Sequence, residues 1–393
     1  MVTIESLREL QSPEGIRLLR ELRCLAPTPA TSIAIATRLR KANPADLVIA
    51  AMELHELRMR ARTKFRQADG MWFTRDGLEQ ATSESIAAYR AKRFVRSPDI
   101  ADLCCGIGGD LLPLAGQAPQ ADILAVDRDP LHLKIAALNA DILGVASRIA
   151  FVESDVREVA LSDATAVFID PARRSDRGRM SLGESEPPLE WCIGLATSDR
   201  AVGIKCAPGL DHGRVPDGWE FEAIALGTDL KEAVLWSPAA ARSRASATVI
   251  DGAMIHHLTP IPGEPVPTRT PIEGETLLDP NPAVTRSGLV EDLARGIGSV
   301  KIDDRIGFLL SSTPVDTPFA RSLRIVASLP WNERRLRARL RELGAGAIDI
   351  RRRGLAGDVD AITRRLRGGG PHPFTIAMTR VMDQPWALIC TPI

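Results

Sequence analysis

Apolar residues near the start of the chain recur at the three- and four-residue spacing of helices that bury one face. This spacing predicts helices over residues 5–22, 31–39 and 44–65. Pro27 and Pro29 separate the first of these helices from the second, because proline interrupts a helix. Residues 1–97 are therefore expected to form a helical region.

One further helix of this region, predicted over 83–94, carries the basic residues Arg90, Lys92 and Arg93. It ends just before the pattern changes to short apolar strands. We expect this helix either to lie across the mouth of an active site or to cover the edge of a sheet.

From residue 98, short apolar runs alternate with helical spacing, which is typical of a parallel sheet with crossover helices. The strands predicted for this region are 100–104, 123–127, 149–154, 164–170, 202–206, 219–226, 233–236 and 247–250. The region is expected to span 98–257. A proline-rich linker over 258–271 then separates it from a last domain over 272–393.

The last domain mixes the two kinds of pattern, which predicts an α+β fold. Its predicted helices are 332–343 and 358–367, and its predicted strands are 348–354, 374–380 and 385–390.

The most informative segment runs from Asp102 to Asp110, with the sequence Asp-Leu-Cys-Cys-Gly-Ile-Gly-Gly-Asp. It overlaps the end of the strand predicted over 100–104 and opens into a helix, and glycines in such a turn bring backbone N–H groups close to a ligand. Twenty-one residues after Gly106, Asp127 ends the next strand, where an acid can hold both hydroxyls of a ribose. The chain is therefore expected to bind an adenosine-containing cofactor.

The glycine pattern distinguishes between such cofactors. A dinucleotide site has the pattern G-x-G-x-x-G, but Leu111 stands at its third glycine position. The pattern here is acid-x-x-x-G-x-G, and the carboxylate of Asp102 would repel a pyrophosphate but attract the ammonium and sulfonium of S-adenosylmethionine. Asp110 favours a positive ligand group for the same reason, although a carboxylate at a helix start also stabilises the helix dipole.

Two later strand ends complete the expected site. Asp155 can accept a hydrogen bond from the adenine amine while the N–H of Val156 bonds the ring, and Asp170 stands where the methyl acceptor is expected. The residues expected to contact the cofactor are Asp102, Cys104, Gly106, Gly108, Asp110, Asp127, Arg128, Asp155 and Val156.

On these motifs, residues 99–250 resemble a class I S-adenosylmethionine-dependent methyltransferase, and the D-x-x-C-G-x-G form is similar to that of several RNA-modifying methyltransferases. With its last domain, the chain resembles a bacterial family that joins such a core to a THUMP-like domain. The resemblance implies an α/β fold: a Rossmann-like class I methyltransferase sheet, an N-terminal helical region and a C-terminal α+β THUMP-like domain. The chain departs from the commonest class I pattern at Cys104, which replaces the first glycine.

The residues after Asp170 bear on the reaction. Enzymes that methylate exocyclic amines usually have an aromatic residue after Asp-Pro to stack the flipped base, whereas this chain has Ala172-Arg173, which argues against standard DNA adenine methylation. Asp-Pro-Ala-Arg is similar to the Asp-Pro-Pro-Arg of RNA uracil C5-methyltransferases, which need a cysteine nucleophile just past the fifth strand. Cys206 stands near that position but lacks the flanking residues, so a buried strand cysteine is the commoner explanation.

We therefore expect the catalytic set to be Asp170, Pro171, Arg173 and Lys205. Asp170 would act as a base or orient an amine proton, and Arg173 and Lys205 would clamp a phosphate or polarise the base.

The formal net charge of zero, taken alone, argues against a nucleic-acid-binding protein. The distribution of charge is more informative, because residues 330–380 contain twelve arginines and five acids. Such a patch suggests a footprint for RNA phosphates, although it is also compatible with the solvated faces of amphipathic helices.

The six cysteines include no C-x-x-C pair, so neither a zinc ribbon nor a disulfide framework is indicated. His256-His257 has no matching ligand set nearby, and no metal is expected. The chain also lacks an apolar run long enough to span a membrane and an N-terminal signal sequence. A reducing cytoplasm is the expected location.

The sequence thus predicts an S-adenosylmethionine-dependent methyltransferase acting on a base in structured RNA, either tRNA or rRNA, held by the C-terminal domain. Two alternatives remain open. One is a small-molecule or protein methyltransferase whose basic last domain binds nothing in particular. The other is a non-catalytic RNA-binding protein with a vestigial methyltransferase core.

Overall fold

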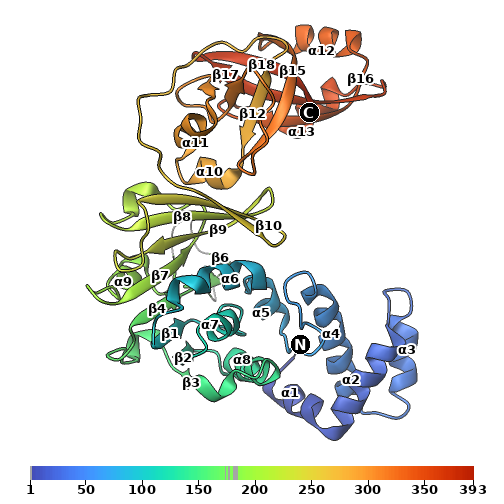
Figure 1. Cartoon of the computed structure of the whole chain (residues 1–393). Helices are drawn as coiled ribbons and strands as arrows, with labels where there is room; N and C mark the ends of the chain where they lie inside the picture. Colours follow the sequence, from blue (N-terminus) through green and yellow to red (C-terminus); the bar gives the residue numbers. More distant parts are fainter. Residues whose placement is uncertain (1, 173, 176–177, 180–184) are drawn as a thin grey trace. The chain divides into compact units, whose positions relative to one another are not determined.

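The structure is a computed structural model that describes residues 2–172, 174–175, 178–179 and 185–393 (Figure 1). The chain divides into two compact units. The first comprises Met1–Cys206 and Leu235–Ala241, and the second comprises Ala207–Val234 and Arg242–Ile393.

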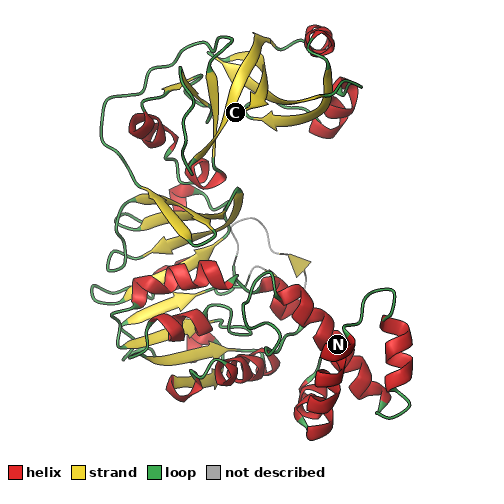
Figure 2. Cartoon of the chain, turned by 45° about the vertical axis from the view of Figure 1, so that its right-hand side comes forward, coloured by secondary structure: helices red, strands yellow, loops and turns green. Residues whose placement is uncertain are grey.

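The N-terminal region is helical, as predicted (Figure 2). Its helices are α1 (Ile4–Gln11), α2 (Pro13–Leu25), α3 (Ser32–Leu39), α4 (Ala45–Ala61), α5 (Arg75–Gln80) and α6 (Glu84–Ala91), with the 3₁₀ turn η1 (Lys92–Phe94). The prediction of one helix over 5–22 is wrong, because the Ser12 side chain caps a new helix by accepting a hydrogen bond from the N–H of Gly15. Pro13 fits the first turn of that helix, where no N–H is needed.

Helix α6 packs on the sheet and buries its basic residue Arg90, whereas Lys92, in the turn that follows, is exposed. Its buried residues include Ile86, Tyr89 and Arg90. The Arg90 guanidinium lies 4.5 Å from the ring centroid of Phe168 in a central strand. Helix α6 therefore packs on a central strand and not at the edge of the sheet, and its position across the mouth of an active site stays a prediction.

Five parallel strands form the sheet of the first unit, in the order β7-β4-β1-β2-β3. They are β1 (Asp99–Leu103), β2 (Asp122–Asp127), β3 (Ile149–Glu153), β4 (Ala166–Ile169) and β7 (Ala201–Cys206). Helices α7 (Leu111–Gln117), α8 (Pro130–Ile142) and α9 (Leu189–Ile193) connect them, with the 3₁₀ turns η2 (Ala146–Arg148) and η3 (Val156–Glu158) and the short pair β5 (Arg174–Ser175) and β6 (Gly178–Arg179).

This sheet confirms the predicted Rossmann-like fold. Since its strands are parallel, their carboxyl ends meet at one edge, where ligands bind in open α/β sheets.

The second unit begins with a group of four neighbouring strands in the order β11-β10-β8-β9. They are β8 (Glu220–Leu226), β9 (Asp229–Trp236), β10 (Ala245–Asp251) and β11 (Met254–Leu258), preceded by the turn η4 (His212–Arg214). The last two residues of β9 belong to the first unit. Strands β8 and β10 are parallel, whereas β10 and β11 form an antiparallel hairpin. The strand at 254–258 was not predicted.

The C-terminal domain contains a seven-stranded sheet in the order β13-β14-β12-β15-β18-β17-β16. Its elements are β12 (Thr276–Pro280), α10 (Pro282–Arg286), α11 (Val290–Ile297), β13 (Val300–Lys301), β14 (Leu309–Ser311), β15 (Ala320–Pro330), α12 (Glu333–Glu342), β16 (Ala345–Arg352), α13 (Val359–Leu366), β17 (His372–Val381) and β18 (Gln384–Pro392). The predicted helices and strands of this domain are present.

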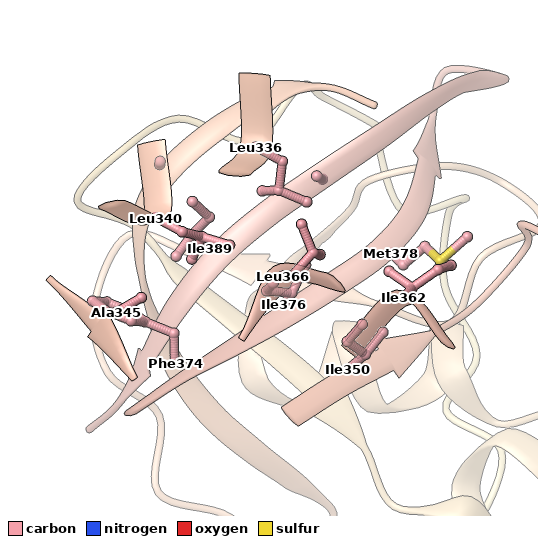
Figure 3. Packing of buried hydrophobic residues seen from close by; sticks show 12 residues of the cluster. Leu336, Leu340, Ala345, Ile350, Ile362, Leu366, Phe374, Ile376, Met378 and Ile389 are labelled. Atoms are coloured by element: carbon pink, nitrogen blue, oxygen red, sulfur yellow. The ribbon is translucent and has the colours of Figure 1, made fainter. Parts of the chain in front are cut away.

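Helices α12 and α13 pack their apolar faces on one end of this sheet (Figure 3). Leu336 and Leu340 of α12 and Leu366 of α13 are fully buried against strand residues such as Ile376 and Ile389. This packing turns the arginine-rich faces of both helices away from the core.

Among the described residues, every helix is too short or too polar to cross a membrane.

Candidate active site

The loop after β1 has the backbone conformation that its glycines permit. Gly106 and Gly108 have φ values of 54° and 92°, and Cys104 shares this left-handed region with a φ of 60°. A Cβ atom at Gly108 would lie 3.3 Å from Leu112 Cγ, whereas one at Gly106 would meet nothing within 4 Å. The loop is therefore tightly packed at Gly108 and open at Gly106.

Cys104 occupies a conformation that costs a residue other than glycine about 1–2 kcal/mol. The commonest class I pattern has glycine here, so this backbone shape explains that preference. Burial raises the pKa of the Cys104 and Cys105 thiols, which keeps them protonated and suits packing residues under a tight turn.

Asp102, the last acid of β1, has a carboxylate that is almost completely buried, with 1% of the residue exposed. Its Oδ2 has no hydrogen-bond partner among the described residues. Burial, followed by the carboxylates of Asp110 and Asp170, raises the pKa of Asp102 well above its ordinary value. A cation bound at this oxygen would favour the ionised carboxylate and so lower the pKa of Asp102.

Asp127 ends β2 with both carboxylate oxygens held by the backbone. Oδ2 accepts a hydrogen bond of 2.7 Å from the N–H of Gly106, and Oδ1 accepts one of 2.9 Å from the N–H of Asp129. Each oxygen keeps a second lone pair for a further donor. The neighbouring Arg128 is exposed.

Asp155 lies just past β3 and is paired with an arginine of its own turn. Arg157 donates to it from Nε at 2.9 Å and from Nη2 at 2.5 Å. These hydrogen bonds lower the pKa of Asp155 to about 2, so the carboxylate is ionised at neutral pH. Arg157 also reaches Glu186 at 2.9 Å, and the next residue, Val156, is buried.

Asp170 follows β4, and its carboxylate is held by a lysine from the neighbouring strand β7. Lys205 Nζ lies 2.5 Å from Oδ2 of Asp170 and donates a second hydrogen bond of 2.8 Å to Oγ1 of Thr82. Oδ1 of Asp170 accepts no hydrogen bond from the residues that the structure describes. Pro171 is buried directly after it.

The Thr82 hydroxyl connects this pair to a second, buried ion pair. It donates a hydrogen bond of 3.2 Å to Oδ2 of Asp110, and Oδ1 of Asp110 is paired with Arg90. Asp110 is therefore already neutralised inside the protein. The Arg90 side chain is 2% exposed, so this ion pair is buried.

The structure brings together four expected residues, Asp102, Asp110, Asp170 and Lys205. Lys205 contacts Asp170, and the charges of Asp110 and Asp170 raise the pKa of Asp102. It also adds Thr82 and Arg90, which sequence reasoning did not assign to the site. Lys205 was expected to clamp a phosphate or polarise a base, but its ammonium is bonded to Asp170 and Thr82. Arg173, the remaining expected catalytic cation, lies outside the described residues.

Cys206, the minority candidate for a nucleophile, is 7% exposed at the end of β7. Its Sγ lies 3.5 Å from the carbonyl oxygen of Ile204 in the same strand. This position suits a buried strand cysteine. Among the described residues, no group of three or more His, Cys, Asp or Glu side chains is arranged to hold a metal ion.

Known proteins similar to this chain identify its family. A protein of Mycobacterium tuberculosis (strain CDC 1551 / Oshkosh), named an uncharacterised S-adenosylmethionine-dependent methyltransferase, is 34% identical over 336 residues, which cover 81% of this chain and 88% of the relative. A protein of the same description from strain ATCC 25618 / H37Rv matches equally well. The chain belongs to this methyltransferase family. The enzyme therefore uses S-adenosylmethionine as its methyl donor.

Three family models match parts of the enzyme. Residues 98–175 match a model described as RNA cap guanine-N2 methyltransferase, residues 320–392 match a THUMP domain-like model, and residues 3–61 match a domain of unknown function. A crystal structure from Porphyromonas gingivalis W83, provisionally named a methyltransferase, superposes with a TM-score of 0.73 at 20% identity. It covers 95% of this chain and 96% of that one, which confirms the methyltransferase fold over nearly the full length.

Proposed function

We propose that the enzyme binds S-adenosylmethionine over the glycine loop and methylates a base in structured RNA, with Asp170 orienting the acceptor. The observation that carries this proposal is the Lys205–Asp170 pair at the end of β4, which fixes one carboxylate oxygen and leaves the other available. The THUMP-like match at residues 320–392 supports RNA as the substrate class.

The residues around the glycine loop fit this cofactor. The buried Oδ2 of Asp102, which lacks a partner among the described residues, suits the ammonium of the methionine end. The open space at Gly106 suits close approach of a ligand to the backbone, and the spare lone pairs of Asp127 suit ribose hydroxyls. Asp155 and the N–H of Val156 remain the proposed contacts for adenine, and Cys104 and Gly108 shape the loop beneath the ligand.

Asp110 has a different proposed function from the one first expected. Its charge is balanced by Arg90, so we assign it to holding Thr82 and, through Thr82, Lys205. Asp102 is then the one carboxylate that we assign to the methionine end of the cofactor. The exposed Arg128 is proposed to border the adenosine end.

In the proposed reaction, bound S-adenosylmethionine supplies an electrophilic methyl carbon to the lone pair of an acceptor nitrogen. Oδ1 of Asp170 accepts an N–H of that amine and directs the lone pair, while Lys205 prevents rotation of the carboxylate. The nitrogen–carbon bond forms as the sulfur–carbon bond breaks, and the released proton passes to Asp170 or to water. The family model for guanine-N2 methylation over 98–175 supports an exocyclic amine as the acceptor.

The RNA-binding part of the proposal rests on an arginine-lined pocket in the THUMP-like domain. Arg337, Arg341, Arg365 and Arg367 line a pocket of about 230 Å³ between α12, α13 and the 367–368 turn. Glu333 pairs with Arg365 at 2.7 Å and with Arg337 at 3.3 Å. The four guanidinium groups in its lining make this pocket suited to an anion such as a phosphate.

Nucleoside mass spectrometry tests the proposed substrate. Transfer RNA and ribosomal RNA from cells with and without the gene are digested, and the modified nucleosides are compared. We expect one methylated nucleoside to be lost from one RNA class and restored by the wild-type gene. Identical nucleoside profiles in both strains would exclude RNA and favour a small-molecule or protein substrate.

A further inference from the structure

A second pocket, of about 320 Å³, lies in the N-terminal part of the first unit. It is lined by α2, by α4 and its C-cap, by the segment over 69–72 and by Ile142 at the end of α8. Its volume falls at the lower end of the ~300–1,000 Å³ that is typical of ligand pockets. The lining residues that come from α2 and α4 belong to the region over 3–61 that matches a domain of unknown function.

The charged lining of this pocket is dominated by arginine. Arg20 and Arg23 come from α2, and Arg58 and Arg62 come from α4 and its end, while Asp69 is the only carboxylate among the lining residues. Asp69 accepts hydrogen bonds of 2.8 and 3.0 Å from Arg62 and lies 3.5 Å from Arg23. The lining thus contains four guanidinium groups and one carboxylate, which makes the pocket cationic.

Arg58 is fixed in place within this cluster. It donates hydrogen bonds to the carbonyl oxygens of Met71 at 2.8 Å and Gly70 at 3.0 Å, and its guanidinium lies 5.4 Å from the ring centroid of Trp72. Burial lowers the pKa of Arg58 to about 10, which still leaves it charged at neutral pH. Nε2 of His55, beside it, is buried and has no hydrogen-bond partner among the described residues.

Apolar side chains also line the pocket, and three of them, together called its apolar wall, are exposed. Ile16, Met59 and Ile142 are 40%, 44% and 36% exposed, and they come from three different helices. Single exposed apolar side chains are ordinary, but three that surround one cationic pocket form an amphipathic site. An anion alone would leave this wall in water, whereas a ligand with both a negative group and a flat apolar face would cover both halves.

We propose that this pocket binds one unstacked nucleotide of the RNA substrate, with its phosphate on the arginines and its base against the apolar wall. The planar guanidinium fork matches phosphate oxygens, and unstacked bases gain stability on apolar and arginine surfaces. This inference rests on the proposed RNA substrate and assigns the N-terminal helical region a part in holding it.

The test uses the full-length enzyme and cellular tRNA or fragmented ribosomal RNA that contains 4-thiouridine. After photo-crosslinking, mass spectrometry locates the attached peptides. We expect crosslinks on the peptides that carry Met59 and Trp72. The double substitution Arg20→Gln/Arg23→Gln should abolish these crosslinks and weaken RNA binding about tenfold. Arg17→Gln is the matched control, because Arg17 is equally exposed on α2 but does not line the pocket, and its binding should stay within about twofold of wild type.

The possible failures are distinguishable. Crosslinks confined to other parts of the chain, with Arg20→Gln/Arg23→Gln binding RNA like the wild type, would overturn the N-terminal pocket and leave RNA methylation intact. No crosslinks to either RNA, together with no measurable RNA binding, would overturn both proposals.

Discussion

Lys205 Nζ lies 2.5 Å from Oδ2 of Asp170 and 2.8 Å from the hydroxyl oxygen of Thr82. The lysine is buried, with 6% of its side chain exposed, whereas the Asp170 side chain is 26% exposed. The cation therefore fixes a carboxylate that still reaches solvent, which is the arrangement that an acceptor-orienting group requires.

Removing the lysine charge should slow turnover without affecting the methyl donor. We expect Lys205→Met to lower kcat by about 10- to 100-fold, because Asp170 loses the contact that fixes its orientation. Affinity for S-adenosylmethionine, measured by calorimetry, should be unchanged. Thr82→Val, which keeps the Lys205–Asp170 contact, should lower kcat less. Equal losses in kcat and cofactor affinity for Lys205→Met would point to general disruption of the sheet edge.

The buried Asp102 carboxylate should make the cofactor-free protein sensitive to pH. Because its pKa is raised in the folded state, the folded protein holds the proton more tightly than the unfolded chain. Its contribution to the free energy of unfolding is therefore lost as pH rises from about 4, the ordinary carboxyl pKa, through the raised value. Asp102→Asn removes this dependence, so its melting temperature should exceed that of the wild type increasingly as pH rises.

The same substitution should weaken cofactor binding, since an amide cannot pair with an ammonium. Melting curves across this pH range and calorimetry with S-adenosylmethionine provide both measurements. Asp122→Asn, at the exposed start of β2, is the control and should alter neither. A stability difference that does not vary with pH would contradict the proposed state of Asp102.

The Arg90–Asp110 pair should be required for stability. Arg90→Met leaves the Asp110 carboxylate buried without its cation, which is expected to cost about 3–5 kcal/mol. Arg90→Met/Asp110→Leu removes both charges and should recover much of this loss in urea denaturation. A double variant as unstable as the single one would mean that Arg90 acts through its packing on Phe168 instead.

Substitution of Cys206 distinguishes methylation of an amine from methylation of a uracil ring through a cysteine nucleophile. Because its thiol is buried and directed toward the Ile204 carbonyl, we expect Cys206→Ala to retain methyl transfer. A covalent adduct with RNA containing 5-fluorouridine, formed by the wild type and absent from Cys206→Ala, would instead establish a uracil C5-methyltransferase.

The sequence predicted those parts of the structure that have a local signature. The strand-loop-helix around Gly106, the acids at strand ends and the two arginine-rich C-terminal helices all follow from spacing over a few residues. The break at Ser12-Pro13 also had such a signature, a capping serine followed by proline, and β15 shows an alternation in which Leu323, Ile325 and Ala327 are buried.

The connections between these parts had no local signature. Thr82 and Lys205 are 123 residues apart, and nothing in the sequence near either residue indicates that they share a hydrogen bond. Arg90 stands in a basic helix that suggests an exposed face, yet Asp110, twenty residues later, allows its charge to be buried. Such pairs form only when the sheet has assembled, because each charge is stabilised by a partner that the fold supplies.

Methyl transfer by wild type and Asp170→Asn tests the central claim most directly. Both proteins are given tritium-labelled S-adenosylmethionine and RNA from a strain that lacks the gene, and label in RNA is counted together with cofactor affinity. We expect the wild type to label RNA and Asp170→Asn to bind the cofactor equally while losing turnover by at least about 100-fold. Full transfer by Asp170→Asn, or no transfer to RNA by the wild type, would contradict the account.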